Sequence, residues 1–224
     1  MTAQEVPAVS VPAPPTRPGL GSRVDAALYG PVLLLGELRG MRRRRAALLG
    51  EARGRVLEIG AGTGLNLRHY PDDLDDLVLT EPDPGMAARL RRTVGRSGRR
   101  AAVVEAGAEA LPAADGSVDT VVSTMVLCTV PDPLAALREI ARVLAPGGRL
   151  LFCEHVLAAD ERTVRRQHRF ADAWAGFASG CRCDRDLLTA IRGALDVDRV
   201  DVETWRGMPV LVHPLVVGSA RPRT

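Results

Sequence analysis

Aromatic residues and long apolar runs are both scarce in this chain. Its 224 residues include only two Trp, two Tyr and three Phe. No apolar run approaches the ~20 residues that cross a membrane, so we expect no stable membrane anchor. The formal net charge of +3 is too small to indicate a nucleic-acid partner. The densest charge run, Arg42 to Arg45, has no interleaved aromatic residue on which bases could stack. We therefore expect no nucleic-acid partner.

Signals for secretion and for a disulfide framework are also missing. The four cysteines, Cys128, Cys153, Cys181 and Cys183, are scattered, and no basic-then-apolar signal peptide opens the chain. This pattern favours free thiols in a reducing compartment, so we expect a cytoplasmic protein. The Cys181-x-Cys183 pair is a weak metal signal, because zinc sites usually combine Cys-x-x-Cys pairs with further ligands. We predict no metal site, and a thiol-dependent role for these cysteines stays open beside inert burial.

The N-terminal part divides into a tail and a helical cap. Residues 1–21 are rich in Pro and Ala without periodicity, which predicts a disordered tail. Residues 22–50 form the predicted cap, with Pro31 suited to a first helical turn. Its apolar residues repeat at helical spacing, which predicts an amphipathic helix over 31–49: Leu34, Leu38, Met41 and Leu48. Since four consecutive residues point all round a helix, most of Arg42–Arg45 must be solvated. A membrane-surface or phosphate-binding role for the run stays open.

From residue 51 to residue 224 we expect one domain in which strands and helices alternate. The predicted strands lie at 55–59, 77–81, 101–104, 119–123 and 149–154. The predicted helices lie at 65–70, 84–96 and 133–144, with Pro-Gly-Gly at 146–148 as the stop signal of the last. Alternation at this spacing predicts a Rossmann-like, doubly wound α/β sheet with right-handed crossovers.

The stretch EIGAGTGLN, residues 58–66, forms the turn from the first strand into the first helix. Such folds bind nucleotides at this turn, beyond the carboxyl ends of the strands. Its glycines permit positive φ and let a ligand touch the bare backbone. The order Gly60-Ala61-Gly62-Thr63-Gly64 breaks the G-x-G-x-x-G spacing of dinucleotide sites. Glu58 would repel a pyrophosphate and suits an amino group instead. Glu81 can hold both ribose hydroxyls, so the pattern indicates S-adenosylmethionine.

Four segments in order resemble the motifs of class I S-adenosylmethionine-dependent methyltransferases. They are VLEIGAGTGLN, LVLTEPDPGM, AEALPAADGSVDTVVSTMVLCTVPDP and LREIARVLAPGGRLLFCEH, and they cover residues 55–155. The resemblance implies a seven-stranded sheet whose last strand runs antiparallel, with the two remaining strands near 197–204 and 210–218. Pro214 is awkward inside the second of these and indicates a bulge or an early end. The resemblance also implies these cofactor contacts: Glu58, Gly60, Ala61, Gly62, Gly64 and Asn66 for the methionine moiety; Glu81 for the ribose; Pro82, Asp83 and Met86 beside the adenosine; Ala108 and Glu109 at the adenine edge; Ser123 and Thr124 over the sulfonium.

One position departs from this pattern. Many relatives carry Asp before the Ala-Glu pair of the adenine loop, where this chain has Gly107. Either Glu109 or a backbone group must then take the adenine amine.

The C-terminal segments narrow the resemblance. VLCTVPDP, FCEHV, SGCRCDRDLL and VHPLVVGSA are similar to a branch of small methyltransferases that includes the alkyl-thiol methyltransferases. The resemblance implies methyl transfer to a small-molecule acceptor, with a thiol as the first candidate. O- or C-methylation of a quinone, lipid-like or polyketide acceptor stays open, as does a non-catalytic cofactor-binding regulator.

Acceptor-side residues are expected after the fifth strand. His155 is the candidate catalytic base, because it follows that strand and an unperturbed imidazole has a pKa of ~6.5; a purely structural role is the alternative. Residues 156–195 form a predicted acceptor-side insertion. There Val164, Ala171, Trp174 and Ala178 repeat at helical spacing. We expect Trp174, Phe177 and Cys128 to line the acceptor pocket, with packing onto the core as the other reading.

Overall fold

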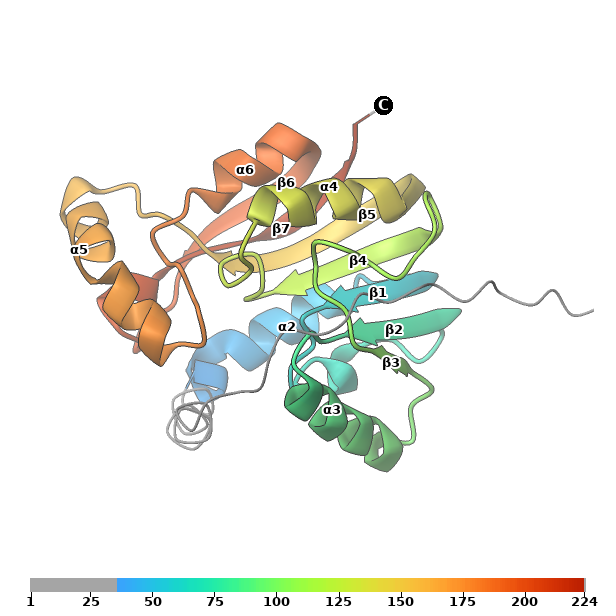
Figure 1. Cartoon of the computed structure of the whole chain (residues 1–224). Coiled ribbons are helices and arrows are strands. Elements are labelled where there is room, and N and C mark those ends of the chain that lie inside the picture. The colour runs from blue at the N-terminus through green and yellow to red at the C-terminus, as the bar shows by residue number, and fades with distance from the viewer. Residues whose placement is uncertain (1–35, 224) are drawn as a thin grey trace, which may run out of the picture.

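The computed structural model describes residues 36–223, which form a sheet covered on both faces by helices (Figure 1). Within this range seven strands form one sheet in the order β3-β2-β1-β4-β5-β7-β6. They are β1 (Arg55–Ile59), β2 (Asp76–Thr80), β3 (Ala102–Val104), β4 (Val118–Thr124), β5 (Leu144–His155), β6 (Leu195–Thr204) and β7 (Pro214–Pro222). Strands β1 to β5 pair in parallel, whereas β7 is antiparallel to β5 and β6. The predicted fold class is confirmed, including its antiparallel last strand.

Helices cover both faces of the sheet, and one further helix extends beyond its edge (Figure 1). The helices are α2 (Arg42–Leu49), α3 (Pro84–Ser97), α4 (Pro133–Val143), α5 (Glu161–Phe177) and α6 (Leu187–Ala194), with a short π-helix η1 (Glu37–Met41) and the 3₁₀ turns η2 (Leu67–His69) and η3 (Val210–Val212). Helices α4 and α6 cover one face of the sheet, and α2 and α3 cover the other (Figure 1). Side chains alternate along a strand. Val121 and Leu150 therefore pack in the hydrophobic core on the side of α4 and α6, whereas Val122 and Leu151 pack in the core on the side of α2 and α3. The parallel strands are therefore buried on both faces.

The carboxyl ends of the parallel strands meet at one edge of the sheet. Figure 1 shows α5 extending beyond this edge. Two helices that begin there are capped by aspartates: Asp83 accepts from Met86 N at α3, and Asp132 accepts from Leu134 N at α4. The turn after β1, the ends of β2 and β4, and the end of β5 thus lie around a common edge.

Several predicted boundaries were wrong. Helix α4 ends at Val143, because Leu144 is already extended with ψ at 128°. Pro-Gly-Gly at 146–148 therefore lies inside β5, beside a register shift against β4. The segment predicted as a helix at 65–70 contains only the 3₁₀ turn η2. The strand expected at 210–218 is β7, which begins only at Pro214 because residues 210–212 form the 3₁₀ turn η3. Pro214 is therefore the first residue of the strand, where a missing N–H costs least, and neither a bulge nor an early end is found there.

The N-terminal cap also departs from its predicted pattern. Met41 and Leu48 are buried as expected, whereas Leu38 is 74% exposed. The reason is a kink at Gly40, whose φ of 105° interrupts the helix before Met41. The predicted tail at 1–21 lies outside the described residues, and so do Pro31 and Leu34 of the predicted cap.

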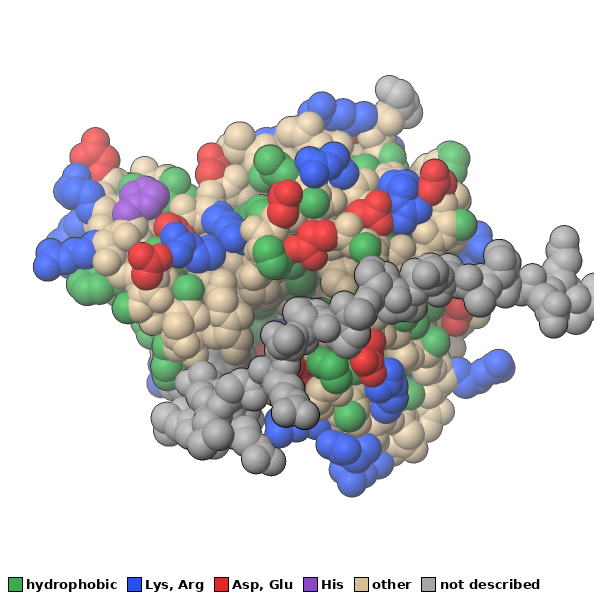
Figure 2. Space-filling view, viewed as in Figure 1, with side chains coloured by type: hydrophobic (Ala, Val, Ile, Leu, Met, Phe, Trp, Pro, Cys, Tyr) green, Lys and Arg blue, Asp and Glu red, His purple; other side chains and the backbone are tan. Residues whose placement is uncertain are grey.

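Charges of both signs are interspersed on the face shown in Figure 2. Among residues 36–223, no helix is both long and apolar enough to cross a bilayer.

Candidate functional site

The turn after β1 exposes backbone at Gly62. Gly60, Gly62 and Gly64 have φ of 56°, 58° and 88°, a region that favours glycine. A Cβ on Gly60 would lie 2.7 Å from Val126 Cγ2, so packing requires glycine there. A Cβ on Gly62 would meet only Met86 Cε, at 3.7 Å. The backbone at Gly62 therefore has space in front of it for a ligand.

Glu58 is a buried carboxylate at the end of β1. It is 2% exposed and accepts hydrogen bonds from Asn66 Nδ2 at 2.8 Å and from Tyr70 OH at 2.7 Å. Burial raises the pKa of Glu58, and these two hydrogen bonds oppose that rise. Since both direct partners are uncharged, the carboxylate suits a cationic ligand group such as an ammonium.

Arg45 enters the same site from α2, which sequence reasoning did not foresee. Its Nη1 donates to Asn66 Oδ1 at 2.7 Å and to Thr124 Oγ1 at 2.9 Å. Arg42 and Arg43 are exposed as expected, but Arg45 is 7% exposed. The expectation that most of the run is solvated left room for one buried member, and that member is Arg45. The run itself could have predicted a buried arginine, because four consecutive helical residues point in every direction around the helix and one of them must face the protein.

Glu81 closes the glycine turn from the end of β2. Its Oε2 accepts from Gly62 N at 2.9 Å and its Oε1 accepts from Asp83 N at 3.0 Å. Burial raises the pKa of Glu81, against the effect of these backbone donors. Each carboxylate oxygen keeps a lone pair for a further donor. Glu81 can therefore hold a vicinal diol while it fixes the turn. Pro82 follows it, and Met86 lies in the first turn of α3.

The residues expected at the adenine edge lie after β3. Ala108 is buried, and Glu109 is half-buried with its Oε1 accepting from Asp132 N at 3.3 Å. A Cβ on Gly107 would lie 3.2 Å from Glu109 Oε2, so a larger residue there would crowd this carboxylate.

Ser123 and Thr124 end β4 with both hydroxyls engaged. Thr124 Oγ1 accepts from Arg45 and from Asn66 Nδ2. Ser123 Oγ donates to Glu154 Oε1 at 2.6 Å, and Glu154 also accepts from Val126 N and Cys128 N. Glu154 thus holds the loop after β4 and makes no hydrogen bond that orients its neighbour His155.

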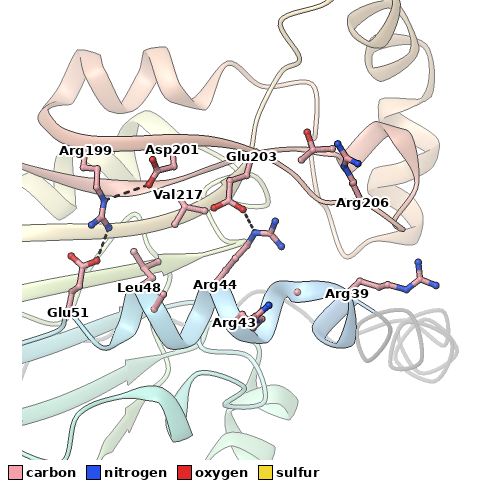
Figure 3. A pocket seen from close by; sticks show the side chains of 13 residues that line it. Arg39, Arg43, Arg44, Leu48, Glu51, Arg199, Asp201, Glu203, Arg206 and Val217 are labelled. Carbon is pink, nitrogen blue, oxygen red and sulfur yellow. Dashed lines mark hydrogen bonds and ion pairs between the residues drawn. The ribbon is translucent and has the colours of Figure 1, made fainter.

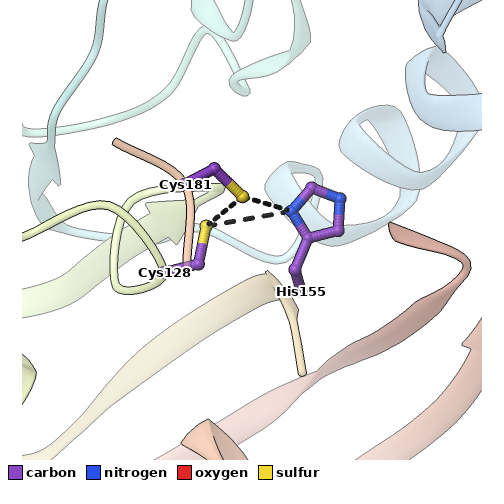
Figure 4. Close-up of side chains that lie close together, drawn as sticks. All are labelled: Cys128, His155 and Cys181. Carbon is purple, nitrogen blue, oxygen red and sulfur yellow. Dashed lines mark hydrogen bonds between the residues drawn. The ribbon is translucent and has the colours of Figure 1, made fainter. Parts of the chain in front are cut away.

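His155 meets two cysteines at the acceptor side (Figure 4). Its Nδ1 lies 3.4 Å from Cys181 Sγ and 3.8 Å from Cys128 Sγ, and the two sulfurs are 3.8 Å apart. All three residues are buried. All four cysteines are free, but Cys181 belongs with Cys128 and His155 rather than with Cys183. The spacing of the cysteines in the sequence did not predict this cluster of Cys128, His155 and Cys181.

The two sulfurs ionise unequally. The pKa of Cys181 is lowered to about 5, mainly by its hydrogen bond with Cys128, and the contact with His155 lowers it further. The hydrogen bond between the two cysteines also raises the pKa of Cys128, with burial adding to it. The contact between the two sulfurs therefore favours ionisation of Cys181 over that of Cys128.

Similarity to proteins of known activity shows the family to which this chain belongs. A family described as "Methyltransferase domain" matches residues 57–152. The thiol S-methyltransferase TMT1A of Homo sapiens is 36% identical over 174 residues, which cover 74% of this chain and 69% of the human protein. The chain belongs to the class I S-adenosylmethionine-dependent methyltransferases.

Two further comparisons bear on this methyltransferase. The demethylmenaquinone methyltransferase of Beutenbergia cavernae is 40% identical over 130 residues, covering 57% of this chain and 52% of that protein. The solved N-methyltransferase NodS of Bradyrhizobium japonicum, in complex with S-adenosyl-L-homocysteine, shares the fold with a TM-score of 0.59. It is 19% identical and covers 82% of this chain and 87% of its own. The cofactor of the methyltransferase is S-adenosyl-L-methionine.

The carboxyl edge of the methyltransferase fits this cofactor. Glu58 suits its ammonium group, the backbone at Gly62 is open to a close approach, and Glu81 suits a ribose. A phosphate would meet two buried acids here, so the residues favour a phosphate-free nucleoside.

Helix α5 carries the aromatic residues expected around the acceptor. Val164 and Trp174 are half-buried and Ala171 is buried, so the predicted amphipathic face is confirmed. The rings of Trp174 and Phe177 lie 5.7 Å apart at 52°, and Phe177 is 39% exposed. Cys128, by contrast, is fully buried.

An open hollow of about 640 Å³ lies away from these residues, between η1, α2 and β6 (Figure 3). Ion pairs from Arg44 to Glu203 and from Arg199 to Glu51 cross it. None of the residues expected in the cofactor or acceptor site lines it.

Proposed function

We propose that this methyltransferase transfers the methyl group of S-adenosylmethionine to the sulfur of a small thiol. The observation that carries the proposal is the extent of the likeness to the thiol S-methyltransferases. Their alignments run over 172 to 174 residues, well beyond the matched domain at 57–152. The likeness to demethylmenaquinone methyltransferases is shorter, at 128 to 141 residues. Elements outside the cofactor domain, where acceptors are selected, therefore favour the thiol reading.

In this proposal Glu58 takes the ammonium group of the cofactor and the backbone at Gly60–Gly64 lies along its methionine moiety. Glu81 holds the ribose hydroxyls. The remaining contacts are proposed from the resemblance and from their places at the same edge: Asn66, Pro82, Met86, Ala108, Glu109, Ser123 and Thr124.

The acceptor approaches from the side of Cys128, His155 and Cys181, with Trp174 and Phe177 of α5 at its outer wall. Cofactor binding supplies a methyl group on a positively charged sulfur. The chain must hold the acceptor sulfur in line with that methyl group and exclude water, because orientation in a dry site supplies most of the acceleration. Residues 51–224 form the catalytic domain in this proposal, with 156–195 as the acceptor-side insertion. A cytoplasmic location agrees with four free cysteines.

The test is transfer of labelled methyl from S-adenosylmethionine to small alkyl thiols, followed by extraction of the thioether. Label in the organic phase with wild-type protein, and its loss in Glu81→Ala, is the expected result. His155→Ala then tests the acceptor side, where we expect cofactor affinity to be kept and thiol turnover to fall. If a reduced naphthoquinone is methylated and thiols are not, the thiol proposal is wrong and quinone methylation replaces it.

A further inference from the structure

The three ligand atoms at the acceptor side form a triangle of distinctive size. Its edges are 3.8 Å between Cys128 Sγ and Cys181 Sγ, and 3.4 Å and 3.8 Å from these sulfurs to His155 Nδ1. Zinc binds sulfur at about 2.3 Å and imidazole nitrogen at about 2.0–2.1 Å with tetrahedral angles. Those values give edges of about 3.8 Å for sulfur to sulfur and about 3.5 Å for sulfur to nitrogen. The side chains therefore already stand at the corners of one face of a zinc tetrahedron.

The backbone around these residues is fixed before any ligand arrives. Cys128 is held because its N–H donates to Glu154 Oε2 at 3.3 Å and its carbonyl accepts from Arg182 N at 2.8 Å. That second bond joins the two cysteine segments directly. Cys181 follows a tight turn in which Ser179 and Gly180 both have positive φ. The ring of His155 stacks on Trp205 with centroids 5.7 Å apart at 22°. A preformed site lowers the cost of ordering its ligands.

Charge also favours a divalent soft metal at this place. Cys128 and Cys181 are 0% and 4% exposed, so two thiolates could not stay ionised there alone. A divalent cation balances two thiolates and leaves the buried group neutral. Two thiolates with one imidazole in tetrahedral arrangement suit zinc, and a Cys₂His set leaves a fourth position open, as catalytic zinc sites do.

We propose that Cys128, His155 and Cys181 bind a zinc ion whose fourth position takes the acceptor thiol as its thiolate. This inference rests on the proposed thiol function and gives His155 the role of a ligand through Nδ1 instead of a base. Among the described residues, His155 Nε2 has no hydrogen-bond partner, so the stack on Trp205 holds the ring in place of a second hydrogen bond.

The chemistry balances without a further reactant. On binding to the metal the thiol releases its proton to water, because a coordinating thiol is deprotonated. The thiolate sulfur then forms a bond to the methyl carbon while the bond from that carbon to the cofactor sulfur breaks. The bonding electron pair stays on the cofactor sulfur, which becomes a neutral thioether. The methylated acceptor is also a neutral thioether, a weaker zinc ligand than a thiolate, and so it leaves.

The first experiment measures metal content in the full chain, purified with a phosphine reductant and without chelators, then supplied with zinc and desalted. We expect about one zinc ion per chain. Cys181→Ala and Cys128→Ala should each lower zinc affinity at least about tenfold, since even outer-shell partners matter this much. Cys183→Ala is the matched control, because it removes the other thiol of the same C-x-C pair and should bind zinc like the wild type.

Two readouts besides activity protect the test against misfolded variants. Zinc should raise the thermal unfolding temperature of wild-type and Cys183→Ala protein, with no such shift in Cys181→Ala. Cobalt(II) in place of zinc should give the visible bands of a tetrahedral thiolate site in the wild type. Zinc content that is negligible, or equal in Cys181→Ala and wild type, overturns the proposal. Loss of two titratable thiols without bound zinc also overturns it, since it identifies a Cys128–Cys181 disulfide.

The metal and the function fail separately. If zinc is absent and thiols are still methylated, the metal proposal is wrong and the proposed function stands. If zinc occupies the cluster and no thiol is methylated, its role as a thiolate site is wrong together with the thiol function.

Discussion

Replacing Glu81 by Ala tests whether the end of β2 holds the ribose of the cofactor. The change removes a carboxylate whose two oxygens already accept from Gly62 N and Asp83 N, at 2.9 and 3.0 Å. In the bound state the same oxygens would also accept from two ribose hydroxyls. The variant therefore loses ligand contacts and also frees the backbone at Gly62 that faces the ligand.

The expected loss follows from these contacts. A hydrogen bond to a charged group contributes about 1.5–3 kcal/mol, so two ribose hydrogen bonds give at least about 3 kcal/mol. Because about 1.4 kcal/mol corresponds to a factor of ten, the Kd for S-adenosylhomocysteine should rise about 100-fold. Glu81→Gln keeps one carbonyl oxygen and should lose about tenfold, between the wild type and Glu81→Ala.

Isothermal titration calorimetry with S-adenosylhomocysteine measures this directly. Glu105→Ala is the matched control, because Glu105 directly follows β3 as Glu81 follows β2 but is exposed and pairs only with Arg91 among the described residues. The affinity of Glu105→Ala for S-adenosylhomocysteine should equal that of the wild type. A Kd for Glu81→Ala within threefold of the wild type would refute the ribose assignment, provided that thermal unfolding shows a folded variant.

The remaining predictions concern the buried acid, the buried arginine and the glycine turn. Burial raises the pKa of Glu58, so as the pH rises above 4.5 the unfolded chain ionises first and the cofactor-free fold loses stability. Glu58→Gln should remove this loss, and its advantage in thermal unfolding should grow with pH through that window while cofactor binding is lost. Arg45→Met breaks a buried ion pair with Glu37 and should destabilise the protein by about 3 kcal/mol in urea unfolding, whereas exposed Arg43→Ala should change it by less than about 0.5 kcal/mol. Gly60→Ala should lower stability more than Gly62→Ala, because its Cβ would strike Val126, while Gly62→Ala should chiefly weaken binding in calorimetry; the reverse order would contradict this assignment.

Local patterns in the sequence located the first five strands and the glycine turn, whereas the last two strands were expected from the resemblance alone. Apolar runs bounded by helical segments located β1 and β4 nearly to the residue, because buried parallel strands need such runs. The glycines at 60, 62 and 64 predicted a turn with positive φ, and all three glycines have positive φ in the structure. Both features depend on residues that are close in sequence.

The missed features depend on residues that are far apart in sequence. Cys128 and Cys181 are 53 positions apart and His155 lies between them, so no spacing pattern could bring them together. Arg45 reaches Thr124 across 79 positions, and its direction is set by how α2 packs after the kink at Gly40. The exposure of Leu38 follows from the same kink. Sequence periodicity assumes an uninterrupted helix and cannot locate such a break.

A competition experiment tests the central claim most directly. The wild-type protein receives isotope-labelled S-adenosylmethionine with an alkyl thiol and a reduced naphthoquinone at equal concentration, and mass spectrometry identifies every methylated product. The proposed function predicts that the label appears in the methyl thioether, that the quinone stays unmodified, and that Glu81→Ala forms neither product at a comparable rate. Label in the quinone with none in the thiol would contradict the account.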